Sequence, residues 1–180
     1  MVDSSLRNIN RNHRISDFEL INQDGRIVTQ KDFEGKIYVA DFFFTTCPSI
    51  CPKMSAQMQR VYEKFIDNEE VMILSHTVMP ETDSVPVLAE YAKRFDVNSK
   101  KWLFVTGKKK KIYELARKSY FAVQNEESAP DESHAGDEHD FIHTENFILV
   151  DKNKRIRGFY DGTSPDDVDR LIEDIEIVLQ

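Results

Sequence analysis

The chain has 180 residues, of which 40% are hydrophobic, and a formal net charge of −8. This length and apolar content predict one globular domain with a core, and the excess of acid argues against nucleic-acid binding, which needs a basic surface. The sequence has no apolar run of about 18 residues and no apolar signal-peptide core at its start, so we expect no membrane span within it.

Strands and helices alternate in the predicted order of elements. A hairpin over residues 17–29 turns at Asp24-Gly25, a pair typical of tight turns. The apolar run at residues 37–44 predicts a strand buried on both faces, and Met54, Met58, Val61 and Phe65 recur at helical spacing. The remaining pattern predicts helices over residues 53–66, 84–95, 112–120 and 164–179, and strands over 71–78, 102–106, 146–150 and 155–160.

This order predicts an α/β fold with a central mixed sheet of about five strands, helices on both faces and an N-terminal β-hairpin. We expect one domain over residues 15–180, preceded by a flexible segment at residues 1–14. The acidic stretch 124–140, QNEESAPDESHAGDEHD, has almost no large apolar residues and predicts a mobile loop. The lysine run 108–111 is interpreted as a solvated helix start.

The chain's two cysteines, Cys47 and Cys51, lie where the strand at 37–44 gives way to a helix. Residues four apart on a helix share a face, roughly 6 Å apart at Cα, which suits a disulfide or a shared metal ion. A helix N-terminus lowers thiol pKa and favours the thiolate needed for either chemistry. A disulfide closing so short a loop adds little stability, so a redox pair and a metal site are the interpretations to weigh.

A metal site needs donors beyond two sulfurs. Two thiolates suit copper(I), and one imidazole would complete a three-coordinate site that also accepts copper(II). Among the five histidines, His13 is expected in solvent, His76 in the core, and His134 and His139 in the acidic loop, where weak copper capture is the lesser alternative. His143 stands just before the predicted strand at 146–150, at a strand mouth where α/β proteins gather sites.

Four segments resemble the Sco/SenC family. FFFTTCPSICPKMSAQM resembles its Cys-Pro-x-x-Cys-Pro segment, MPETDSVPVLAEYAKRF its lead-in to a helix, WLFVTG its Trp-containing strand and HTENFILVDKNKRIRGFY its histidine, strand and hairpin. The resemblance covers residues 15 to 179 and implies a thioredoxin-like fold. The chain departs from the family pattern at Met79 and Ile142, where the family has an aspartate and often has an acid, respectively.

The resemblance implies a copper metallochaperone for assembly of the dinuclear copper site of cytochrome c oxidase. It implies that Cys47, Cys51 and His143 bind one copper ion per chain, as Cu(I) or Cu(II). The implied partners are the copper-site subunit of the oxidase, other copper chaperones and thioredoxin-like reductants. The implied location is extracytoplasmic, at the periplasmic face of a bacterial inner membrane in preference to the mitochondrial intermembrane space, with a membrane anchor in the full-length protein.

Asp41 lies six residues before Cys47 within the apolar strand, on the same face as Val39 and Phe43. A buried carboxyl should have a raised pKa, and thioredoxins place an aspartate at the matching position, where it aids proton transfer to their cysteines. A structural aspartate bonded to backbone is the alternative. If Asp41 is functional, the chain carries out more thiol–disulfide exchange than a pure copper carrier. A thiol–disulfide oxidoreductase acting through Cys47 and Cys51 is the second hypothesis beside copper delivery.

Overall fold

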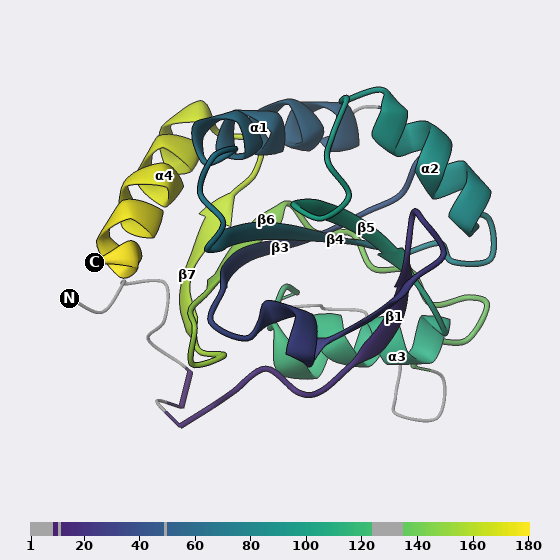
Figure 1. Cartoon of the computed structure of the whole chain (residues 1–180). Helices are drawn as coiled ribbons and strands as arrows, with labels where there is room; N and C mark the ends of the chain where they lie inside the picture. The colour runs from purple at the N-terminus through teal and green to yellow at the C-terminus, as the bar shows by residue number, and fades with distance from the viewer. Residues whose placement is uncertain (1–8, 11, 49, 124–134) are drawn as a thin grey trace.

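The computed structural model describes residues 9–10, 12–48, 50–123 and 135–180. Helices and strands follow one another in nearly the predicted order (Figure 1). The elements are β1 (Glu19–Asn22), β2 (Ile27–Thr29), the 3-10 helix η2 (Gln30–Phe33), β3 (Ile37–Phe43), α1 (Ile50–Lys64), β4 (Val71–Thr77), α2 (Val85–Lys93), β5 (Trp102–Thr106), α3 (Lys109–Glu114), the π-helix η3 (Leu115–Ser119), β6 (Asn146–Val150), β7 (Ile156–Asp161) and α4 (Pro165–Leu179).

The strands form one mixed sheet of seven strands in the order β2-β1-β5-β4-β3-β6-β7. The central strands β3, β4 and β5 are parallel, whereas β6 pairs antiparallel with β3. The predicted number of about five strands was too low because the N-terminal hairpin joins the same sheet, with Ile21 of β1 opposite Thr106 of β5. The predicted mixed sheet and its N-terminal hairpin are confirmed.

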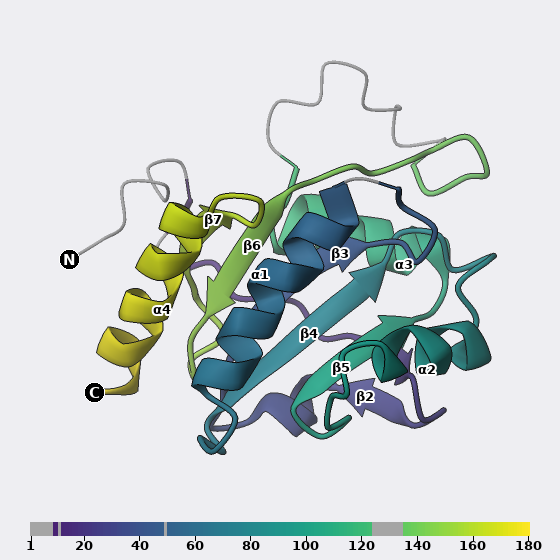
Figure 2. The same cartoon turned by 90° about the horizontal axis from the view of Figure 1, so that it is seen from above.

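Two layers of helices enclose the sheet. Helices α1, α2 and α4 lie over one face and α3 over the other (Figures 1 and 2). Alternate residues of β3 divide between the two resulting cores, since Val39 and Phe43 pack toward α1 while Tyr38 and Phe42 pack toward α3. Every residue of β3 and β4 is buried, as a strand covered on both faces requires.

The turn and cap signals of the sequence place their elements correctly. Gly25 adopts a positive φ of 76° in the β1–β2 turn, which a glycine accommodates without strain. The Ser164 side chain accepts a hydrogen bond from the backbone N–H of Asp167 at the start of α4, as an N-cap serine does.

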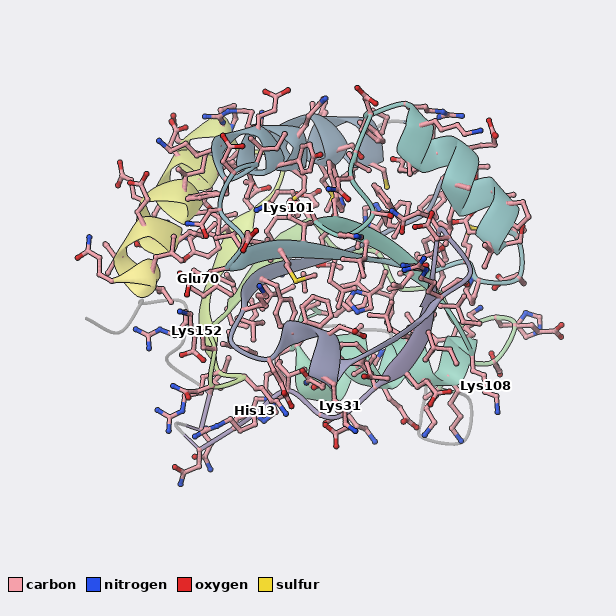
Figure 3. All side chains as sticks on the ribbon, in the orientation of Figure 1. His13, Lys31, Glu70, Lys101, Lys108 and Lys152 are labelled. Carbon is pink, nitrogen blue, oxygen red and sulfur yellow. The ribbon has the colours of Figure 1, made fainter. Side chains whose placement is uncertain are left out.

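The predicted helix over residues 112–120 starts earlier and changes type. It begins at Lys109 and continues from Leu115 as a π-helix, whose last turn closes with the Tyr120 N–H donating to the Leu115 carbonyl at 2.7 Å. Lys108 is exposed just before this helix (Figure 3), and Lys110 and Lys111 are exposed as well. The Lys109 side chain is only 15% exposed and lies over the Tyr113 ring, so the predicted solvated helix start is correct for three of the four lysines.

In the part of the chain that the structure describes, no helix is both long enough and apolar enough to cross a bilayer.

Candidate metal and thiol site

Cys47 and Cys51 face each other across the start of α1. Cys47 precedes the helix, and its N–H donates to the Phe44 carbonyl at 3.3 Å. Cys51 lies in the first helical turn, where its N–H donates to the Cys47 sulfur at 3.4 Å. Both residues are buried thiols, only 8% and 5% exposed. The sulfur of Cys47 therefore caps a helix that starts only after it, a geometry that differs from the predicted single helical turn.

Burial raises the pKa of the Cys51 thiol, and its hydrogen bond with Cys47 raises that pKa further. This outcome is opposite to the lowering that a helix N-terminus alone predicts, because burial and the neighbouring Cys47 thiol outweigh the one contact that lowers the pKa, a hydrogen bond with the Phe44 backbone. The thiolate form of Cys51 therefore needs a second source of stabilisation, and a bound cation is one, since metal binding displaces thiol protons.

Asp41 lies in β3 on the face that packs toward α1, and its side chain is buried as predicted. Ser75 of β4 donates its hydroxyl to the Asp41 carboxylate and accepts the indole N–H of Trp102 at 3.0 Å. Burial raises the pKa of Asp41 to about 7, although the Ser75 hydrogen bond opposes that rise. Asp41 thus has a carboxyl that changes charge near neutral pH, on the same face of the sheet as the two thiols.

His143 is exposed, three residues before β6. The antiparallel pairing of β6 with β3 brings this end of β6 to the end of β3 that leads into the cysteine segment. The Phe141 ring meets the Phe44 ring edge-on, with centroids 5.4 Å apart, so the two segments touch at this edge of the sheet.

The segment before His143 is fixed to the body of the protein by an ion pair. Arg117 donates to both carboxylate oxygens of Asp140, at 2.5 and 2.8 Å, and the Gly136 N–H donates to Asp140 at 2.7 Å. Burial alone would raise the pKa of Asp140, but these hydrogen bonds outweigh it and the pKa is lowered. Residue 140, at the end of the predicted mobile loop, is therefore a fixed point.

The other histidines have differing surroundings. His13 is half-buried against Phe121 and bonds through Nε2 to the Ser119 carbonyl at 2.7 Å, in contrast to the solvated residue predicted (Figure 3). His76 is fully buried in the core toward α3, as predicted, and burial lowers its pKa to about 4. His139 is exposed, and His134 lies outside the described residues.

The structure brings the two sulfurs together and leaves His143 apart from them. Within the described part of the chain, no three side chains from histidine, cysteine, aspartate and glutamate stand close enough to hold a metal ion. Two adjacent thiols can form a disulfide or bind a soft metal, and a third donor would have to come from movement of the His143 segment.

One residue of this edge was quoted in the sequence only as part of a motif. Asp83 lies in the segment between β4 and α2. Its buried carboxylate accepts hydrogen bonds from the backbone N–H and the hydroxyl of Thr45, two residues before Cys47. Asp83 lies in the segment MPETDSVPVLAEYAKRF, whose resemblance to the family's lead-in to a helix was the available signal, but nothing in the sequence pairs Asp83 with Thr45.

The SCO1/SenC family model matches residues 7–180 of this chain. Among solved structures, a SCO1/SenC family lipoprotein from Bacillus anthracis is similar with a TM-score of 0.78 and 26% identity, covering 94% of this chain and 97% of the other. BsSco, a member of the Sco family of cytochrome c oxidase assembly proteins with a disulfide switch, has a TM-score of 0.75 and 30% identity, covering 94% and 95%. Arabidopsis thaliana ScoI with copper bound has a TM-score of 0.68 and 28% identity, covering 92% and 97%.

Proposed function

The chain belongs to the SCO1/SenC family, and from this premise we propose that it binds one copper ion and delivers it during assembly of cytochrome c oxidase. The proposed ligands are Cys47, Cys51 and His143. The observation that carries the proposal is the buried pair of thiols, with the Cys51 N–H 3.4 Å from the Cys47 sulfur. The copper-bound Arabidopsis relative supports the choice of metal.

The donor set fits copper better than zinc. Structural zinc takes four ligands, whereas Cys47 and Cys51 are the chain's only cysteines. Copper(I) accepts two thiolates, and an imidazole adds the harder donor that copper(II) prefers. The exposed position of His143 is compatible with a ligand that approaches after the sulfurs have bound the ion.

The proposed recipient is the copper-site subunit of the oxidase, whose cysteines would take the ion by ligand exchange. A site with three protein ligands leaves a coordination position for the incoming sulfur. We place this exchange on the extracytoplasmic side of the membrane, with an anchor in the full-length protein, and the lipoprotein relative supports that location.

Anaerobic titration of the reduced protein with copper(I), and separately with copper(II), tests this function. We expect one ion per chain and a thiolate-to-copper charge-transfer band with copper(II), both lost in Cys47→Ser and in Cys51→Ser. His143→Ala should weaken copper(II) binding by more than the roughly 10–100-fold typical of an outer-shell change, and copper(I) binding much less. His139→Ala is the matched control, an exposed histidine of the same segment, and should change neither affinity. An unchanged copper(II) affinity in His143→Ala would remove that residue from the site.

A second candidate function is thiol–disulfide exchange, which the position of Asp41 favours. The Cys47 thiolate would attack a partner disulfide and release one partner thiolate, and Cys51 would then displace the second partner sulfur. The partner gains two electrons and two protons, while this chain is oxidised to a Cys47–Cys51 disulfide. Asp41, whose pKa is raised to about 7 by burial, would accept the Cys51 proton, and the disulfide switch of BsSco supports this chemistry in the family.

Cys51→Ser should trap the exchange reaction half-way. With the resolving thiol removed, we expect a mixed disulfide between Cys47 and the cysteine pair of the oxidase copper subunit, visible as a covalent complex on non-reducing gels. Asp41→Asn should slow exchange in the otherwise unchanged protein. Cys47→Ser is the control and should give no complex. If Cys51→Ser yields no complex and Asp41→Asn exchanges at the normal rate, the oxidoreductase function is wrong.

A further inference from the structure

We propose that Asp83 is a positioning residue, which holds the segment carrying Cys47 in the geometry of the reduced thiol pair, the form that binds copper. The part of this inference that concerns copper rests on the function proposed above, whereas the part that concerns the thiols does not. The observation behind it is a buried carboxylate whose hydrogen bonds reach across the sheet edge to the cysteine segment.

The Asp83 side chain is buried, with the residue only 1% exposed. Its Oδ2 accepts the Thr45 backbone N–H at 3.0 Å and the Thr77 hydroxyl at 2.6 Å, and its Oδ1 accepts the Thr45 hydroxyl at 2.5 Å. Hydrogen bonds to an ionised acceptor are shorter and about twice as strong as neutral ones. Three of them fix both oxygens of the carboxylate and leave Thr45 little freedom.

Thr45 passes this restraint to the cysteines because it lies within the turn that closes on Cys47. The Cys47 N–H donates to the Phe44 carbonyl, so residues 44–47 form one hydrogen-bonded turn, and the Cys47 sulfur in turn accepts the Cys51 N–H. Asp83 therefore begins a series of contacts that runs through this turn to the Cys47 sulfur and the Cys51 backbone.

Asp83 is itself held in place from β4. Its N–H donates to the Met79 carbonyl at 2.8 Å, and the Met79 N–H donates to the Thr77 hydroxyl at 3.0 Å. Thr77 ends β4, and it is the parallel partner of Phe43, which ends β3. The carboxylate thus joins the ends of two neighbouring parallel strands, where the loops of α/β proteins build their sites.

Capping of the following helix does not explain this arrangement. The N-cap of α2 is Ser84, which makes no side-chain capping bond, and the three hydrogen bonds of the Asp83 carboxylate go to Thr45 and Thr77. A carboxylate retained only to start α2 would be directed at the first N–H groups of that helix. Instead it is directed at the cysteine segment.

The variants Asp83→Ala and Asp83→Asn test this role. Alanine removes all three hydrogen bonds. Asparagine can keep its oxygen on the Thr45 N–H and the Thr77 hydroxyl, while its NH₂ donates to the Thr45 hydroxyl after that hydroxyl rotates. We expect Asp83→Ala to weaken copper(II) binding 10–100-fold, the range for outer-shell changes, and Asp83→Asn to restore most of the loss.

Equilibration of the copper-free protein with dithiothreitol measures the thiol pair separately. In this reaction the Cys47–Cys51 disulfide is reduced to two thiols while dithiothreitol forms its own cyclic disulfide. A disulfide would hold the short Cys47–Cys51 loop covalently, whereas the dithiol form depends on the Asp83 hydrogen bonds. Loss of these bonds should therefore destabilise the dithiol form more than the disulfide form. We expect Asp83→Ala to shift the equilibrium constant about tenfold toward the protein disulfide, which is about 30 mV for this couple.

Asp151→Asn is the matched control. Asp151 is also buried and accepts backbone N–H groups, from Asn153 and Arg155, but in the β6–β7 turn. It should leave both the copper(II) affinity and the dithiothreitol equilibrium unchanged. If Asp83→Ala does not fold, Thr45→Val replaces it and should shift both quantities in the same direction by a smaller factor.

Two results would overturn the inference. One is a folded Asp83→Ala protein with wild-type copper(II) affinity and wild-type thiol equilibrium. The other is an equal change in the Asp151→Asn control. If the wild-type protein binds no copper but Asp83→Ala still shifts the thiol equilibrium, the copper function is wrong and the positioning role of Asp83 stands.

Discussion

Asp41→Asn should make the protein more stable above pH 7, by up to about 4 kcal/mol in the free energy of unfolding. Burial raises the pKa of Asp41 from 3.8 to about 7 in the folded protein. Between these values the unfolded chain has lost the proton that the folded protein keeps, so stability falls as the pH rises and the full penalty is reached above pH 7. Asparagine carries no charge and can still accept the Ser75 hydroxyl.

His76 makes the free energy of unfolding change with pH in the opposite direction to Asp41, over part of the same pH range. Burial lowers its pKa from 6.5 to about 4. Between these pH values the unfolded chain binds a proton at His76 and the folded protein does not, so the free energy of unfolding falls as the pH drops from 6.5 toward 4. The wild-type protein should therefore show a nearly flat stability profile between about pH 4 and 6.5. In Asp41→Asn the contribution of His76 is no longer cancelled, so the free energy of unfolding should rise with pH in this range.

Urea unfolding of both proteins at intervals from pH 4.5 to pH 8.5, conditions chosen to span both transitions, measures these slopes. The double variant Asp41→Asn/His76→Gln is the control, since glutamine can still donate to the Asp41 carbonyl that His76 contacts at 3.1 Å, and its profile should be flat again. If Asp41→Asn runs parallel to the wild type at every pH, Asp41 does not carry the raised pKa.

The pattern of apolar residues was enough to predict β3, its burial on both faces and the burial of Asp41. Alternation and helical spacing report which side chains leave water, and Asp41 lies between Val39 and Phe43 in a strand whose every residue is buried. The same reasoning placed Cys47 and Cys51 at a strand-to-helix junction, because the change from a continuous apolar run to helical spacing occurs there.

Features that depend on contacts between distant segments could not be predicted from the sequence. Nothing local indicates that β1 pairs with β5, and this pairing enlarges the sheet to seven strands. Asp83 and Thr45 are 38 positions apart and meet only because two strands end side by side. The raised pKa of Cys51 follows from burial by neighbouring elements, which a local helix-dipole argument omits. The gap between His143 and the sulfurs depends on how a long segment is held, and spacing does not encode that.

The Arg117–Asp140 ion pair, which fixes the segment before His143, is expected to have the second large effect on stability. Arg117→Ala should lower the free energy of unfolding by about 3 kcal/mol, because it leaves the Asp140 carboxylate buried without its cation. The side chains of Asp140 and Arg117 are only 2% and 16% exposed. The pKa of Asp140 is lowered in the folded protein, so the contribution of the pair is present at neutral pH and is lost as the pH falls toward that pKa.

Arg60→Ala is the matched control for this experiment. Arg60 also pairs with an aspartate, Asp169, but their side chains are 41% and 56% exposed, and exposed pairs contribute about 0–1 kcal/mol. Urea unfolding at neutral pH should therefore separate the two variants by about 2 kcal/mol or more. Equal losses in both would show that the buried Arg117–Asp140 pair contributes no more to stability than an exposed pair.

The same variant connects this anchor to copper. Asp140 lies three residues before His143, and Phe141 between them packs on Phe44 of the cysteine segment. The anchor limits how far His143 can move from the sulfurs, so its loss should raise the entropic cost of bringing the imidazole to the metal. Arg117→Ala should therefore weaken copper(II) binding about 10-fold or more while copper(I), held mainly by the two sulfurs, changes little. An Arg117→Ala protein that is less stable but binds copper(II) normally would mean that His143 reaches the metal without help from the Arg117–Asp140 pair.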